Sequence, residues 1–176
     1  MENNKPTTGK VALKYGIILG LIGITFNLML YFQDLHYQID MSRIFLALGL
    51  GVVLTIIASI LGILEFRKAN NGFISFPEGL KIGVGATLIS GVIGIIFGFV
   101  LAHVIDPDMT DKAIEYSTNM MLESGMDPEM VEKQIESQKD PNYVLQIAGG
   151  LIFNLFIGFV GTLIPALALK KSEPQY

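Results

Sequence analysis

The sequence predicts an all-α integral membrane protein: a four-helix bundle with an extramembrane amphipathic helical hairpin between its third and fourth helices. Four stretches, 15–33, 44–64, 82–105 and 143–169, contain no Asp, Glu, Lys or Arg. Each approaches or exceeds the about 20 apolar residues that a helix needs to cross a ~30 Å hydrocarbon core. We therefore expect a single membrane domain over 1–176, with spans 11–33, 44–64, 79–105 and 141–169 and an outer insertion 106–140.

The first span follows Lys5, Lys10 and Lys14, an arrangement also found at the start of a secretory signal. Its apolar run is longer than the ~7–15 residues of a signal-peptide core, and it ends in Tyr31-Phe32-Gln33-Asp34 instead of a small-residue cleavage site. We expect an uncleaved first helix.

The second and third spans are joined by a short connection with its own start and stop signals. Asn70-Asn71-Gly72 is typical of a turn, because Asn and Gly tolerate positive φ. Ser75 and Glu78 have the spacing of a capping box. The third helix is therefore expected to begin before its apolar part.

The outer insertion contains three Asp-Pro pairs, Asp106-Pro107, Asp127-Pro128 and Asp140-Pro141, each able to start a helix. They predict helices over 107–123 and 128–138, a break at 124–125, and then the fourth span. The first of these helices has an apolar face, which includes Met109, Tyr116, Met120 and Met121. That face either covers the bundle or the lipid headgroups, which we favour, or binds a protein partner.

The distribution of charge predicts the orientation in the membrane. Eight of the twelve Lys and Arg residues lie in the N-terminal segment, the second connection and the C-terminal segment, whereas the insertion 106–140 is acidic. The positive-inside rule then places both termini of this multi-pass membrane protein in the cytoplasm.

Helix packing is predicted from small residues spaced by four, which allow two backbones to approach closely. Every span carries such a row, and the third span carries two adjacent rows, so we expect it at the centre of the bundle. The candidate packing residues are Gly16, Gly20, Gly51, Ser90, Gly94, Gly98 and Gly158.

Three polar side chains are predicted at membrane depth: Asn27, His103 and Asn154. An unpaired amide is costly in hydrocarbon, so we expect these groups to face protein and form hydrogen bonds between helices, in preference to a transport site. His36 in the first connection could approach His103, which leaves an outer metal site as a weak alternative.

Chemistry beyond packing has little support in the sequence. The chain has no Cys, which excludes disulfides and thiol nucleophiles, and the four spans hold no acidic or basic residue that could relay protons. No catalytic motif is present. We therefore expect no enzymatic activity, no catalytic residues, no cofactor, no metal and no nucleic-acid partner.

Several short motifs, in their order along the chain, resemble the bacterial domain-of-unknown-function 4199 family. They are Asn71-Gly72-Phe73-Ile74-Ser75-Phe76, the Gly-rich third span, Glu132-Lys133-Gln134, Pro141-Asn142, and Leu163-Ile164-Pro165-Ala166-Leu167-Ala168-Leu169-Lys170-Lys171. The resemblance covers nearly the whole chain and implies a small four-helix membrane protein, without assigning an activity or a site. Pro77 departs from the family pattern, where a small residue is expected, but Pro suits the first turn of a helix.

Two classes of function stay open. The first is a non-enzymatic membrane or envelope interaction protein, which contacts the lipid bilayer and a protein partner through its acidic outer helices. The alternative is a small transporter or channel formed by a homo-oligomer, with a polar path through Asn27, Asn154 and His103. The lack of charge at membrane depth favours the first class.

Overall fold

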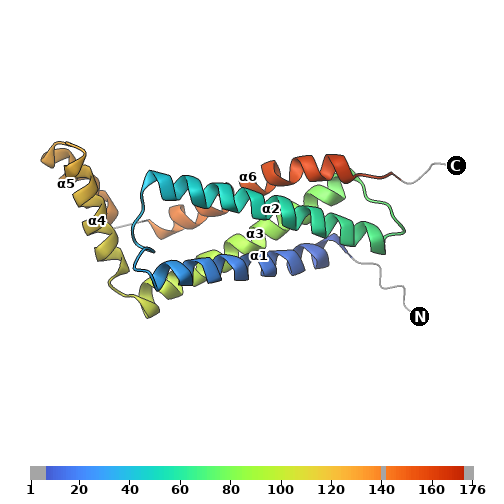
Figure 1. The fold of residues 1–176 in the computed structure, drawn as a ribbon, viewed down its shortest axis with the longest axis horizontal. Coiled ribbons are helices and arrows are strands. Elements are labelled where there is room, and N and C mark those ends of the chain that lie inside the picture. Colours follow the sequence, from blue (N-terminus) through green and yellow to red (C-terminus); the bar gives the residue numbers. More distant parts are fainter. Residues whose placement is uncertain (1–6, 140–141, 173–176) are drawn as a thin grey trace.

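A computed structural model describes residues 7–139 and 142–172 of the chain. In these residues the regular structure consists of six α-helices and one short π-helix, and an isolated antiparallel bridge joins Ile74 to Lys171. Four helices are long and apolar enough to cross a membrane, and they lie side by side along the long axis of the molecule (Figure 1). The prediction of an all-helical chain with four apolar helices is confirmed.

The first two long helices extend beyond the predicted spans where caps allow it. Helix α1 (Thr8–Tyr31) begins after Thr7, whose hydroxyl accepts a hydrogen bond from the Lys10 N–H at 3.2 Å. Helix α2 (Met41–Ala69) begins after Asp40, whose carboxylate accepts from the Arg43 N–H at 2.9 Å. These caps satisfy amides that the first turn of a helix leaves unpaired, so polar residues outside the apolar core join the helices.

The third long helix, α3 (Phe76–Val100), starts at the predicted capping box. The Ser75 hydroxyl accepts from the Glu78 N–H, and the Glu78 carboxylate accepts from the Ser75 N–H at 2.8 Å. At its other end α3 continues into a π-helical turn, η1 (Leu101–Ile105). The chain then turns sharply at Asp106, whose N–H donates to the Leu101 carbonyl.

The two helices predicted within the insertion 106–140 are present as α4 (Met109–Glu123) and α5 (Pro128–Lys139), with a break at Gly125, which has a φ of +83°. They lie across one end of the bundle (Figure 1), which we call the hairpin end. The opposite end, where α1 begins and α6 (Tyr143–Leu169) finishes, is the terminal end. Asp106 does not cap α4 as predicted, since α4 begins at Met109, two residues after the predicted start at 107. Asn142 caps α6, whereas Asp140-Pro141 lies outside the described residues.

Helix α3 is the centre of the bundle, as predicted, because it packs against α1, α2 and α6. The best packed region lies at the terminal end. There, buried side chains from α1, α2, α3, α6 and the α2–α3 connection form one cluster, consisting of Val11, Ile63, Phe66, Ile74, Ile82 and Ala166.

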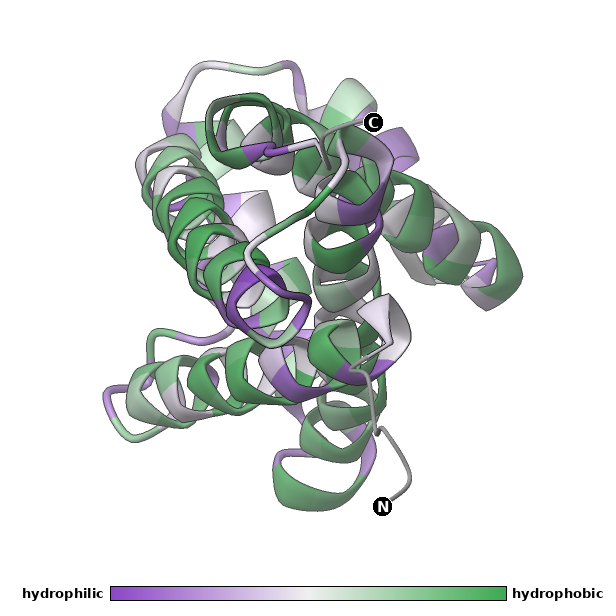
Figure 2. Ribbon diagram, turned by 90° about the vertical axis from the view of Figure 1, so that its right-hand side faces the viewer, coloured by the Kyte–Doolittle hydropathy of each residue, from purple (hydrophilic) through white to green (hydrophobic). Residues whose placement is uncertain are grey.

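The bundle is much looser at the hairpin end. Phe45 on α2 is 69% exposed and Val144 on α6 is 79% exposed, although both belong to apolar spans. Apolar residues lie on the outward sides of the long helices as well as between them (Figure 2). Such surfaces are expected where lipid is the surrounding solvent, and uncommon on a soluble protein.

The packing glycines divide between these two regions. A Cβ built on Gly16 or Gly20 would overlap Ile89 or Ile93 of α3, and a Cβ on Gly158 would come within 2.9 Å of Thr87. At Gly51, Gly94 and Gly98, by contrast, a built Cβ meets no atom of another described segment within 4 Å. The structure therefore shows no packing role for these three glycines, because no described neighbouring helix lies against them. Ser90 lies half-buried between the two regions.

Candidate functional site: a polar cluster and a cleft at the hairpin end

A polar cluster connects the outer helices to the bundle, and Asp106 is its central residue. This buried carboxylate, placed between η1 and α4, accepts a hydrogen bond from His36 Nε2 at 2.8 Å. It also accepts from Lys112 Nζ, at 2.8 Å and 3.0 Å for its two oxygens. Because His36 belongs to the α1–α2 connection and Lys112 to α4, one carboxylate joins three segments of the chain.

The electrostatics of the cluster stabilise the ion pair. The Lys112 ammonium, hydrogen-bonded to Asp106, lowers the pKa of that carboxyl; burial acts in the opposite direction, and the His36 hydrogen bond lowers it further. The same contact raises the pKa of Lys112. Both groups are therefore charged around neutral pH, and the carboxylate, which can only accept, requires a proton on His36 Nε2.

His36 is enclosed by aromatic rings. Its imidazole lies edge to face with Tyr31 at 5.0 Å and with Tyr37 at 5.2 Å, measured between ring centroids. Lys112 Nζ lies over the Tyr37 ring, 5.9 Å from its centroid. The buried Nδ1 of His36 has no hydrogen-bond partner among the described residues.

The structure does not bring His36 and His103 together as a metal site. His36 pairs with Asp106, whereas His103 stacks on Phe99 with 4.0 Å between ring centroids. Its Nδ1 lies 3.0 Å from the Phe99 carbonyl, which can only accept, so that nitrogen carries a proton. In the described part of the chain, no group of three or more His, Asp or Glu side chains could hold a metal ion.

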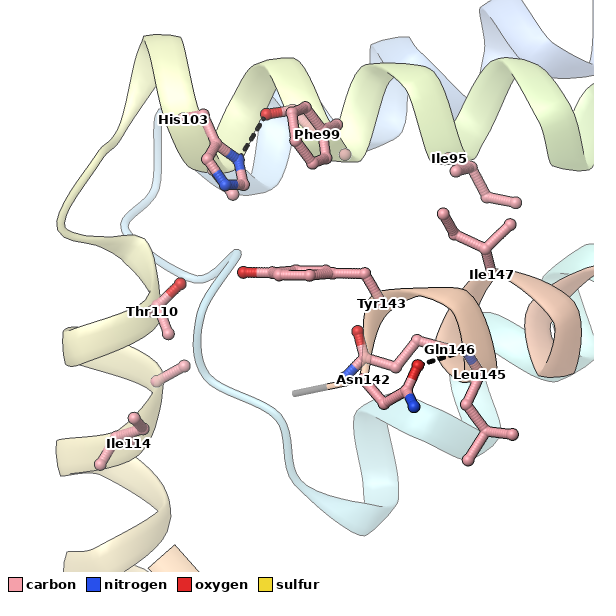
Figure 3. A pocket seen from close by; sticks show the side chains of 13 residues that line it. Ile95, Phe99, His103, Thr110, Ile114, Asn142, Tyr143, Leu145, Gln146 and Ile147 are labelled. Atoms are coloured by element: carbon pink, nitrogen blue, oxygen red, sulfur yellow. Dashed lines mark hydrogen bonds between the residues drawn. The ribbon is translucent and has the colours of Figure 1, made fainter. Parts of the chain in front are cut away.

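A cleft of about 860 Å³ lies beside this cluster, between α3, η1, α4 and the start of α6 (Figure 3). Its deeper walls are apolar and include Ile95, Gly98 and Ile147, and its outer end carries hydroxyl, imidazole and amide groups. The Tyr143 side chain reaches from α6 across the opening toward α4 (Figure 3). The full lining consists of Ile95, Gly98, Phe99, Ala102, His103, Thr110, Ala113, Ile114, Asn142, Tyr143, Leu145, Gln146 and Ile147.

The two predicted membrane-depth amides do not form the interhelical hydrogen bonds expected of them. The Asn27 amide is exposed and donates to the Gly23 carbonyl of its own helix at 3.0 Å. Asn154 is half-buried against Gly91, and its amide donates to the Gly150 carbonyl at 2.9 Å. An Asn amide one turn after a carbonyl can bond locally, and here the local bond satisfies the donor without a second helix.

A buried interhelical hydrogen bond lies instead between Ser59 of α2 and Thr162 of α6, whose hydroxyls are 2.9 Å apart. In the sequence both residues belong to rows of small residues spaced by four, Ser59 with Gly51 and Thr55, and Thr162 with Gly158 and Ala166. The signal that could have found them is their position: each lies in a small-residue row in the cytoplasmic half predicted for its span, where the rows come closest.

The predicted partner face of α4 lies partly against the molecule and partly free. Met109, Tyr116 and Met121 are half-buried, and Met120 is exposed. Helix α5 packs on α4 and buries Val131 and Ile135. The outer helices thus have a small core of their own, and no α4 side chain is fully buried.

Comparison with known proteins identifies the family of this chain. The family described as "Protein of unknown function (DUF4199)" matches residues 14–171, which is most of the chain. Neither a search of curated proteins nor a search of solved structures found a match.

Proposed function

We propose that this chain, which belongs to the DUF4199 family of proteins of unknown function, is a non-enzymatic interaction protein of the bacterial cytoplasmic membrane. The four apolar helices support a lipid-embedded bundle. In this proposal both termini are cytoplasmic, and α4 and α5 form an extracytoplasmic hairpin that binds another component of the envelope.

The observation that carries the proposal is the attachment of the hairpin. It is joined to the bundle through the Asp106 cluster, and otherwise packs mainly on itself. An element held firmly at its base, with Met120, Leu122 and Met130 exposed, is suited to present an apolar surface to a partner. A lid would instead be expected to bury those side chains against the bundle.

The alternative, a channel or transporter formed by an oligomer, has weaker support. Asn27 lies on an exposed side of α1, Asn154 faces Gly91 of α3, and His103 lines the cleft. A continuous polar path would need these three faces to meet across two copies, and each amide already donates within its own helix.

The proposal can be tested by site-specific photo-crosslinking in cells. A crosslinker at Met120, which is apolar and exposed, should give a discrete product with an envelope protein, and the double substitution Met120→Ser with Met121→Ser should abolish that product when probed from Leu122. The control position is Glu115, which is exposed on the same helix but polar. Identical products from both positions would contradict the proposal. Products containing only a second copy of the 19.2 kDa chain would favour the oligomer.

A further inference from the structure

The hairpin-end cleft has the dimensions of one leaflet of a bilayer. Asp106 ends the third span, and Ile95, the deepest lining residue on α3, precedes it by eleven positions. At a helical rise of ~1.5 Å per residue, this corresponds to a depth of roughly 16 Å, close to half of a ~30 Å hydrocarbon core. The volume of about 860 Å³ lies within the range of small-molecule sites, ~300–1,000 Å³.

Polarity changes along the cleft in the same direction as it does along a lipid. The deep lining is apolar, whereas Thr110, Tyr143 and Gln146 at the outer end present hydroxyl and amide groups. The structure gives these three side chains no hydrogen-bond partner within its described ranges, 7–139 and 142–172. His103 adds its second ring nitrogen, because Nδ1 is already used toward Phe99.

The charges around the opening restrict the class of head group. Among the described residues, those that line the cleft include no Asp, Glu, Lys or Arg. Asp108 and Asp111, however, lie on either side of Thr110 and are exposed, whereas the nearby Lys112 ammonium is already paired with the Asp106 carboxylate. A phosphate carrying a net negative charge would be repelled there, and an ammonium group would be attracted.

We propose that this cleft binds one phospholipid without net charge, with an acyl chain between α3 and α6 and its ammonium-bearing head group beside α4. This inference rests on the proposed function only in placing the bundle in a bilayer, and it does not require a protein partner for the hairpin. The hydrogen-bonding groups at the opening would hold the ester and phosphate oxygens, which distinguishes this lipid from those that merely surround the bundle.

The absence of Trp from the chain permits a direct test. We would place single reporters by Phe99→Trp, inside the cleft, and by Val100→Trp, at nearly the same depth but outside the lining. Each protein is reconstituted in phosphatidylglycerol vesicles with increasing brominated phosphatidylcholine, and Trp quenching is measured. One hydrogen bond in the membrane corresponds to roughly 3- to 20-fold in affinity. The Phe99→Trp protein should therefore reach half-quenching at a mole fraction of brominated phosphatidylcholine lower, by about that factor, than the Val100→Trp protein requires.

A matched pair of substitutions separates the cleft from the rest of α3. Neither Gly94 nor Gly98 has an atom within 4 Å of a built Cβ, but only Gly98 lines the cleft. Gly98→Phe should therefore remove the difference between the two reporters, and Gly94→Phe should leave it. When brominated phosphatidylglycerol is added to phosphatidylcholine vesicles, the Val100→Trp protein should be quenched before the Phe99→Trp protein, because unbrominated phosphatidylcholine occupies the cleft.

Three results would overturn the inference. Equal quenching of both reporters in every mixture would mean that only exchanging lipid enters the cleft. Quenching of Val100→Trp alone by brominated phosphatidylcholine would mean that protein, such as a second copy, fills the cleft. If neither reporter is quenched, the bundle does not lie in the bilayer, and the proposed function falls together with the lipid site.

Discussion

Individual glycines differ in what a side chain would meet, and the contrast between Gly83 and Gly94 is the clearest. A Cβ on Gly83 would overlap the Thr162 side chain and the Ser59 hydroxyl, the pair that forms the buried hydrogen bond between α2 and α6. Gly94 lies in the same helix with free space around it. Position in a helix therefore does not decide the effect of a substitution, because the distance to the neighbouring helix does.

We predict that Gly83→Ala lowers the free energy of unfolding by ~1–3 kcal/mol, the usual cost of overpacking. Gly94→Ala should be neutral or stabilising by up to about 1 kcal/mol, since Ala is the better helix former. Thermal unfolding of both variants in detergent measures the difference. Equal losses would show that α3 and α6 also touch at Gly94.

The Asp106 cluster predicts a pH dependence for the attachment of the hairpin. The pKa of Asp106 is lowered in the folded protein, so its contribution is complete above the ordinary value of ~3.9 and is lost as the pH falls through the lowered folded value. The pKa of Lys112 is raised, so its contribution is complete below ~10.4 and is lost at higher pH. The ion pair should therefore stabilise the hairpin between about pH 4 and pH 10.

Asp106→Asn should abolish this dependence. At neutral pH we expect faster amide hydrogen exchange in α4, because Lys112 loses its ion pair and the buried His36 keeps only a neutral acceptor. At pH values below the folded pKa of Asp106, the variant and the unmodified protein should exchange alike. A difference between them that persists in acid would mean that the substitution acts through packing instead of charge.

Among the secondary-structure elements, α3 depends most on its own start signal. The Ser75–Glu78 capping box fixes the beginning of the helix that packs on all three other spans. We predict that Ser75→Ala lowers the free energy of unfolding by about 1 kcal/mol, whereas Ser75→Thr, which keeps the hydroxyl, loses much less. Unfolding in detergent distinguishes them, and equal losses from the two variants would argue against the cap.

The outer helices show how one carboxylate can position an element. Helices α4 and α5 pack on each other. They are attached to the bundle by the Asp106–Lys112 salt bridge and by the hydrogen bond from His36, which lies between α1 and α2. An element of this kind can move as a unit if the ion pair breaks, while the apolar spans stay packed.

For the whole molecule, the prediction that matters most is its orientation in the membrane. The chain has no Cys, so single cysteines introduced at Ser124 and at Ala69 report separately on the two ends of the bundle. With intact cells, a membrane-impermeant thiol reagent should label the Ser124→Cys protein and not the Ala69→Cys protein. Both residues are exposed, so burial does not prevent labelling. Labelling of both from the same side would exclude the four-span topology.

The sequence by itself determined the four apolar helices, the start of α3, the two helices of the insertion with their break at Gly125, and the central place of α3. These follow from local chemistry: apolar length, caps and turn residues, and two small-residue rows on one helix. Only the tertiary structure decided which glycines pack, that Asp106 pairs with His36 seventy residues away, and that a cleft opens between α3 and α6. Periodicity places a residue on a face of its helix, whereas contact depends on the distance to the next helix, which the tilt and separation of whole helices determine.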